Sequence, residues 1–158
     1  MIIILEGPDG AGKTTLANYL RDKFGYMIVH RSKPETLEDK LRMYEQYRNS
    51  ILKGDNLIWD RCWYSEMVYG PVMRDQSYID LNQMYEYEEL LRVRGAVLIH
   101  CTDEIELLWK RMQERGEPYI KDIEVLDRLR VNYEFLMHKV PHRIPVLRYE
   151  LSKNMSFL

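Results

Sequence analysis

One segment near the amino terminus has residue types and spacing that suit the binding of a phosphate chain. Residues 7–14 read Gly-Pro-Asp-Gly-Ala-Gly-Lys-Thr, which fits the pattern G-x-x-x-x-G-K-[ST]. In this pattern the glycines let backbone N–H groups approach phosphate oxygens, the lysine reaches the outer phosphates and the hydroxyl binds Mg²⁺. We therefore predict a site for Mg-ATP built from the residues of this loop: Gly7, Pro8, Asp9, Gly10, Ala11, Gly12, Lys13, Thr14 and Thr15.

Charged residues also follow two apolar runs that are expected to form strands. Arg31 follows residues 26–30, and Asp60 and Arg61 stand at the end of residues 57–60. The carboxyl ends of parallel strands meet at one edge of a sheet, so these charges can converge on the phosphate loop. We predict that Arg31 and Arg61 hold the phosphate of an acceptor molecule. Asp60 would bind Mg²⁺ together with the loop threonine, or accept the acceptor's proton; a structural salt bridge between Asp60 and Arg61 is the alternative.

Two further arginines are spaced to lie on one side of a helix. Arg111 and Arg115 are four residues apart, just before Gly116. We predict a short mobile lid over residues 111–122 whose closure brings both cations over the transferred phosphate and excludes water. A solvated helix face that pairs with nearby glutamates is the alternative.

Aromatic residues are numerous, with 12 tyrosines and three tryptophans. Most tyrosines at helical spacing fill a protein interior. From the aromatic and cationic residues near the expected acceptor pocket, only Arg48 and Tyr69 are therefore predicted as contacts to the acceptor's base. The four histidines, at positions 30, 100, 138 and 142, show no metal-ligand spacing, and no role is predicted for them.

The periodicity of apolar residues predicts the elements that position these groups. Continuous apolar runs predict buried parallel strands, and repeats of three or four predict helices. Strands are expected at 2–5, 26–30, 57–60, 96–101 and 144–149, and helices at 13–24, 37–53, 81–94, 105–115 and 126–140. A short helix after residue 62 is expected to break at Gly70-Pro71, and Thr102 to cap the helix that follows it. This alternation predicts an α/β fold in three layers, with a five-stranded parallel sheet flanked by helices.

Composition narrows the class of protein further. The chain has 158 residues with a net charge of −2, so it is large enough to fold without disulfides and too weakly basic for a general grip on nucleic acid. Cys62 and Cys101 form no C-x-x-C pair, which argues against a zinc site or a secreted disulfide framework and favours the cytoplasm. No signal peptide, membrane span or linker is apparent, so a single domain over residues 1–158 is expected.

Two motifs together resemble the thymidylate kinase family of P-loop kinases. Residues 6–15 resemble that family's phosphate loop, and residues 60–65, Asp-Arg-Cys-Trp-Tyr-Ser, resemble its D-R-Y-x-x-S segment. The resemblance extends from about residue 1 to residue 137. It implies a kinase that transfers the γ-phosphate of Mg-ATP to a thymidylate-like pyrimidine deoxynucleotide, dTMP or a 5-substituted dUMP. It also implies that Asp9 meets the acceptor's deoxyribose 3′-hydroxyl.

The same resemblance implies roles for the outlying residues. Arg31 corresponds to the arginine on the acceptor phosphate, Tyr69 to an aromatic position beside the acceptor, and Arg111 and Arg115 to the start of the arginine-bearing lid. The chain differs from the family at Ser32, Cys62 and Gly70, where a phenylalanine, a tyrosine and a glutamine are expected.

Two other functions stay open at this point. Relatives of thymidylate kinase in phages phosphorylate the hydroxymethyl group of 5-hydroxymethyluracil in DNA, so modified DNA is an alternative acceptor, in the host cytoplasm if the chain is encoded by a phage. A regulator that binds ATP or GTP without any acceptor is the second alternative. Under each of these functions, the chain could form a homodimer.

Overall fold

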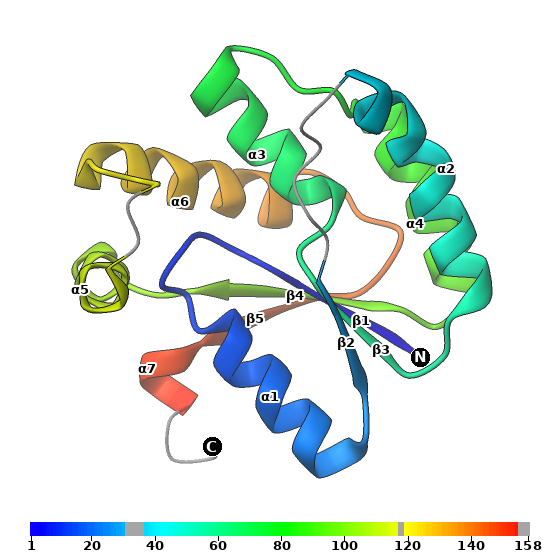
Figure 1. Cartoon of the computed structure of the whole chain (residues 1–158), viewed down its shortest axis with the longest axis horizontal. Helices are drawn as coiled ribbons and strands as arrows, with labels where there is room; N and C mark the ends of the chain where they lie inside the picture. Colours follow the sequence, from blue (N-terminus) through cyan, green and yellow to red (C-terminus); the bar gives the residue numbers. More distant parts are fainter. Residues whose placement is uncertain (31–36, 117–118, 155–158) are drawn as a thin grey trace.

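The computed structural model describes residues 1–30, 37–116 and 119–154, which form an α/β fold around one parallel sheet (Figure 1). Its five strands lie in the order β2-β3-β1-β4-β5, and every pairing is parallel. The strands are β1 (Ile2–Glu6), β2 (Met27–His30), β3 (Leu57–Asp60), β4 (Val97–Thr102) and β5 (Val146–Glu150). The predicted fold class is confirmed.

Helices cover both faces of the sheet, which makes three layers. They are α1 (Lys13–Phe24), α2 (Leu37–Lys53), α3 (Trp63–Arg74), α4 (Leu81–Val93), α5 (Ile105–Arg115), α6 (Ile123–His138) and α7 (Leu151–Asn154). Figure 1 shows α1 and α7 on one side of the sheet, and α2, α3, α4 and α6 on the other. Among the described residues, none of these helices has the length and apolar character needed to cross a bilayer.

The central strand brings the charged residues to one edge of the sheet. All five residues of β1 are buried, as expected of a strand with a partner on each side. Its register sets Leu5 beside Asp60 of β3 and Glu6 beside His100 of β4. The carboxyl ends of three strands are therefore level with one another, directly below the loop that follows β1.

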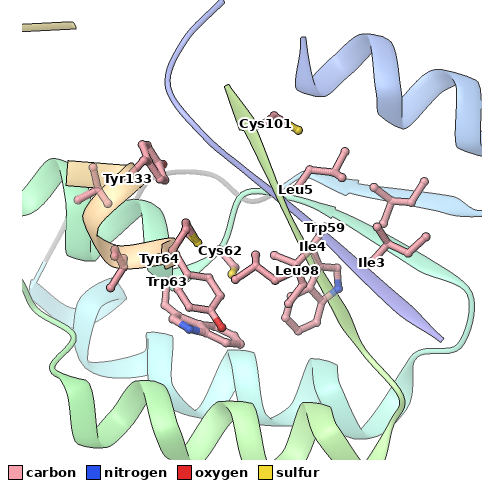
Figure 2. Close-up of a cluster of buried hydrophobic side chains, with 14 of the residues drawn as sticks. Ile3, Ile4, Leu5, Trp59, Cys62, Trp63, Tyr64, Leu98, Cys101 and Tyr133 are labelled. Carbon is pink, nitrogen blue, oxygen red and sulfur yellow. The ribbon is translucent and has the colours of Figure 1, made fainter. Parts of the chain in front are cut away.

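Aromatic side chains pack helices α2, α3 and α4 against β3. Trp63 lies with its ring centroid 4.4 Å from that of Tyr87 and 5.0 Å from that of Tyr47. Trp59 of β3 lies 5.9 Å from Trp63, and all four rings are buried. Figure 2 shows Trp59 and Trp63 beside the aliphatic residues of β1 and β4. The prediction that most tyrosines fill the interior is therefore confirmed for Tyr47 and Tyr87, and Trp59 and Trp63 are core residues as well.

The predicted break at Gly70-Pro71 is wrong, because α3 continues to Arg74. Pro71 lies close to the end of the helix, where its missing N–H removes a single backbone hydrogen bond and its fixed φ is helical. Glu66 holds the end of the helix in place, since its carboxylate pairs with Arg74 and accepts the N–H of Tyr78 at 3.1 Å.

Two helix starts also differ from the predictions. Thr102 does not cap α5, because it belongs to β4, where it pairs with Glu150 of β5. The residue before α5 is Glu104, and its side chain makes no capping hydrogen bond. Helix α6 begins at Ile123, three residues before the predicted start, because the Asp122 carboxylate accepts the N–H of Glu124 at 2.8 Å and caps the helix there.

A buried ion pair joins α4 to the segment between α6 and β5. The Glu88 carboxylate accepts hydrogen bonds from the Tyr64 hydroxyl at 2.7 Å and the Arg143 N–H at 2.7 Å, and it lies 2.6 Å from Nδ1 of His142. Nε2 of His142 lies 2.8 Å from the carbonyl oxygen of Leu136. Because both ring nitrogens face acceptors, the imidazole is held as a cation. Burial lowers the pKa of His142, but the hydrogen bonds to Glu88 and Leu136 outweigh burial and raise it.

This pair predicts a pH-dependent stability. A folded-state pKa above the unfolded value adds stability that is fully present below about pH 6.5 and is lost as pH rises through the raised folded-state pKa. Urea unfolding at about pH 5.5 should show the wild-type chain more stable than His142→Gln by roughly 1.5–3 kcal/mol, the worth of a hydrogen bond to a charged group. At about pH 8.5 the difference should shrink. A difference that stays constant with pH would show that His142 is not charged in the fold.

Candidate active site

The loop between β1 and α1 can be built only from glycine at two of its positions. Gly7 and Gly10 have φ of +150° and +79°. A Cβ on Gly7 would lie 1.9 Å from the carbonyl oxygen of Cys101, and one on Gly10 would lie 2.4 Å from that of Leu108. Strand β4 and helix α5 therefore press directly on the loop, and their backbone atoms cannot move aside for a side chain. This close packing restricts the backbone of the loop to one conformation.

Gly10→Ala tests this packing, with Gly25→Ala as its matched control. Gly25 also has a positive φ, of +73°, but a Cβ there meets nothing within 4 Å. Gly25→Ala should therefore cost only the left-handed backbone term, about 1 kcal/mol of unfolding free energy. Gly10→Ala should cost at least about 2 kcal/mol more and weaken ATP binding as well. Equal losses measured by urea unfolding and nucleotide titration would contradict the tight fit at Gly10.

The lysine of the motif is folded into the loop. Nζ of Lys13 donates to the carbonyl oxygens of Gly7 at 2.9 Å and Pro8 at 2.8 Å, and the side chain is buried. Burial and the neighbouring cation of Arg61 lower the pKa of Lys13 to about 8. The amine is still protonated at neutral pH, and a bound phosphate chain would favour its charged form. Thr14 and Thr15 follow Lys13 in the chain and are exposed in the first turn of α1.

A carboxylate inside the loop is held by two residues from beyond β3. The Asp9 carboxylate accepts hydrogen bonds from Arg61 at 2.7 Å and from the Tyr69 hydroxyl at 2.7 Å, while Arg61 also reaches the Tyr69 oxygen at 3.3 Å. Burial is the main cause of the raised pKa of Tyr69, and the negative charge of Asp9 adds to it, so the phenol stays a neutral donor. The structure thus brings together three predicted acceptor-binding residues.

The arginine of this group has an unusual backbone. Arg61 has a φ of +71°, which is costly for a residue with a side chain. Its N–H donates to the carbonyl oxygen of Leu5 at 3.0 Å, and its guanidinium reaches the hydroxyls of Ser65 at 3.3 Å and Tyr133 at 3.2 Å. Backbone and side chain are therefore both fixed toward the loop.

Beneath the arginine lies a buried glutamate that is not among the predicted site residues. Glu6 accepts the Cys62 N–H at 2.6 Å, the Ser65 hydroxyl at 2.7 Å and the Tyr133 hydroxyl at 3.0 Å. Burial raises the pKa of Glu6, and the charge of Arg61 opposes that rise. Glu6 thus anchors the start of α3 under Arg61. The signal for it in the sequence is an acidic residue directly after four apolar residues of a central strand.

One predicted lid arginine lies against the phosphate loop. Arg111 donates to the carbonyl oxygen of Gly10 at 3.2 Å and to the buried carboxylate of Asp103 at 2.9 Å. Asp103 in turn accepts the Ser152 N–H at 3.0 Å. Burial raises the pKa of Asp103, but the hydrogen bonds from Ser152 and Arg111 outweigh it and hold the pKa below its usual range. In this structure Arg111 braces the loop, whereas Arg115 is exposed one turn further along α5.

The other predicted site residues are Asp60, Arg48 and Arg31. The carboxylate of Asp60 lies 3.3 Å from Nδ1 of His30, at the carboxyl ends of β3 and β2. Arg48 is exposed on α2. Arg31 lies outside the described residues.

Comparison with known proteins places the chain in a family. A family model described as polyphosphate kinase 2 (PPK2) matches residues 1–127. The chain belongs to the PPK2 family. This membership, together with the relatives below, confirms the predicted P-loop nucleoside and nucleotide kinase superfamily.

The relatives of this PPK2-family chain include two proteins that bear the names of nucleoside or nucleotide kinases. YorR, a prophage-derived uncharacterized protein of Bacillus subtilis, is 32% identical over 126 residues, which cover 78% of this chain and 75% of YorR. A crystal structure of YorR with phosphorylated GDP aligns with a TM-score of 0.79 at 25% identity, over 99% of this chain and 94% of the other. The deoxyguanosine kinase of B. subtilis is 25% identical, over 92% of this chain and 82% of the enzyme. A probable thymidylate kinase of Archaeoglobus fulgidus is 26% identical, over 82% and 77%.

Proposed function

We propose that this PPK2-family chain is a phosphotransferase that moves the γ-phosphate of Mg-ATP to a thymidylate-like pyrimidine deoxynucleotide. The observation that carries the proposal is the position of Asp9. Its carboxylate belongs to the phosphate-binding loop, yet Arg61 and Tyr69 from beyond β3 hold it, each at 2.7 Å. A protein that only bound ATP would have no need of this second cluster.

Each residue then has a separate task. The backbone of the loop and Lys13 bind the β- and γ-phosphates, with the start of α1 adding its positive dipole. Asp9 accepts a hydrogen bond from the sugar hydroxyl of the acceptor, and Arg61 neutralises charge on the acceptor's phosphate. That phosphate is already largely ionised at neutral pH, so its oxygen attacks the γ-phosphorus with no base, and ADP leaves. Positioning and fixed cations therefore suffice for the transfer.

The residues suit Mg²⁺ as the ion that accompanies ATP. Thr14 and Asp60 supply a hydroxyl and a carboxylate, and hard oxygen ligands of this kind are the ones Mg²⁺ prefers. Thr14 is exposed beside Lys13, and the Asp60 carboxylate lies on the same edge of the sheet. When bound, the ion would neutralise charge on the β- and γ-phosphates.

A labelled-phosphate assay tests the proposal. The chain is incubated with γ-labelled ATP and Mg²⁺ against separate acceptors: dTMP, 5-substituted dUMP, the other deoxynucleoside monophosphates, deoxynucleosides, plain DNA and DNA containing 5-hydroxymethyluracil. One arm replaces ATP by inorganic polyphosphate, because the family bears that name. We expect label in the diphosphate of the pyrimidine nucleotide.

Each other outcome overturns a defined part of the proposal. Label in modified DNA alone would make the chain a DNA-base kinase, and catalysis would then weaken steeply with salt because protein cations replace counterions on the strand. Label in a purine product alone would reject the pyrimidine acceptor but keep the phosphotransferase. ATP binding without turnover on any acceptor would leave a nucleotide-binding regulator.

A further inference from the structure

Away from the loop, three side chains from β4 and α6 converge on a single point. Nδ1 of His100 lies 3.0 Å from Nε2 of His138 and 3.9 Å from a carboxylate oxygen of Glu134. One ligand atom from each residue lies within 4.8 Å of the other two. The spacing of the histidines along the sequence could not indicate this convergence, because Glu134 and His138 share a face of α6 at i and i+4 whereas His100 comes from a distant strand.

We propose that His100, Glu134 and His138 form a binding site for a divalent transition-metal ion of the zinc class. In a tetrahedral zinc site with bonds of 2.0–2.1 Å, neighbouring ligand atoms are roughly 3.3 Å apart. The two separations from Nδ1 of His100, 3.0 and 3.9 Å, lie on either side of that value. Two imidazole nitrogens and one carboxylate oxygen bind such an ion, and a water molecule completes the fourth position.

The surroundings of the three ligands fit the same assignment. Arg148 donates to both carboxylate oxygens of Glu134, at 2.8 and 2.7 Å, which orients the carboxylate as an outer partner of a metal ligand does. His100 is completely buried and lies nearly parallel to the ring of Tyr133, at an interplanar angle of 23°. Its ring is therefore fixed before any ion arrives.

The cluster of His100, Glu134 and His138 also differs from the proposed magnesium site in its access to solvent and in its ligand atoms. His138 is exposed and Glu134 is partly exposed, so an ion can reach the buried nitrogen from solvent. Mg²⁺ prefers oxygen ligands and binds imidazole poorly, which separates this site from the carboxylate of Asp60. A bound ion would link α6 to β4 and add to the stability of the folded chain, independently of the proposed function.

Cobalt and zinc titrations of the full chain without a histidine tag or nucleotide, in excess Mg²⁺, test the site. We expect one equivalent of Co²⁺ to give a visible absorption band, and Zn²⁺ to displace it. Zinc at about 100 times its dissociation constant should raise the melting temperature by roughly 5–10 °C.

Matched variants on the exposed side of α6 locate the ion without disturbing the core. Loss of a residue that only hydrogen-bonds a metal ligand typically weakens metal binding by about 10–100-fold. His138→Ala removes a ligand itself, so it should weaken metal binding by about that factor or more. Lys139→Ala, an exposed neighbour, should bind like the wild type. Circular dichroism confirms that both variants are folded. The proposal is overturned if His138→Ala binds metal as the wild type does. It is also overturned if neither metal changes the absorption spectrum or the melting temperature of the wild-type chain.

Discussion

Lys13→Ala should lower phosphotransferase turnover by about 10³-fold or more, because under the proposed function its amine is the loop's fixed cation on the transferred phosphate. Its charge is already confined to the loop by the carbonyl oxygens of Gly7 and Pro8. A bound triphosphate takes over these contacts, and no other lysine belongs to the loop. Turnover measured at saturating ATP separates the loss of catalysis from the loss of nucleotide affinity.

Lys23→Ala is the matched control for Lys13. Lys23 is exposed in the last turn of the same helix, and its amine donates to the Tyr19 hydroxyl at 2.7 Å. This variant should keep wild-type turnover. The pKa of about 8 adds a second readout, since ATP affinity in the wild type should weaken as pH rises past that value. Retained turnover in Lys13→Ala would show that the loop binds phosphate without catalysing its transfer.

Arg61→Ala should lower kcat/KM for the acceptor by about 10²–10³-fold while changing ATP affinity far less. The guanidinium is a hydrogen-bond partner of Asp9, and its charge lowers the pKa of the buried Glu6 against the effect of burial. Its removal takes this cation away from two carboxylates, and under the proposed function it also removes the bidentate donor to the acceptor phosphate. Acceptor and ATP are varied separately in steady-state assays, and the melting temperature is recorded for each variant.

Two further variants keep this prediction testable if Arg61→Ala is unstable. Tyr69→Phe removes only the hydroxyl that reaches Asp9, so its acceptor kcat/KM should fall by roughly 3–10-fold with little change in stability. Arg92→Ala, an exposed arginine on α4, should change neither quantity. Equal losses for acceptor and ATP in Arg61→Ala would contradict its assignment to the acceptor side.

Local features of the sequence were sufficient for the fold class and for the phosphate loop. The apolar run of β1, the glycines after it and the helical repeat after Lys13 are close together in the chain, so their structure follows from short-range sterics and burial. The meeting of Arg61 with this loop was also predictable, because parallel strands place their carboxyl ends on one edge. Helix boundaries were harder to predict from the sequence. Thr102, for example, belongs to β4 because it pairs with Glu150 of β5.

The partners of the charged groups were decided by tertiary structure alone. Tyr133 contacts Glu6 across 127 positions of sequence, and Arg111 reaches Gly10 across 101. No periodicity encodes such pairs, because they depend on how α5 and α6 pack against the sheet. The same packing brings His100 to His138. The amino-acid sequence by itself therefore determined which loop can hold phosphate, whereas the packing of distant helices decided which side chains hold Arg61 and brace that loop.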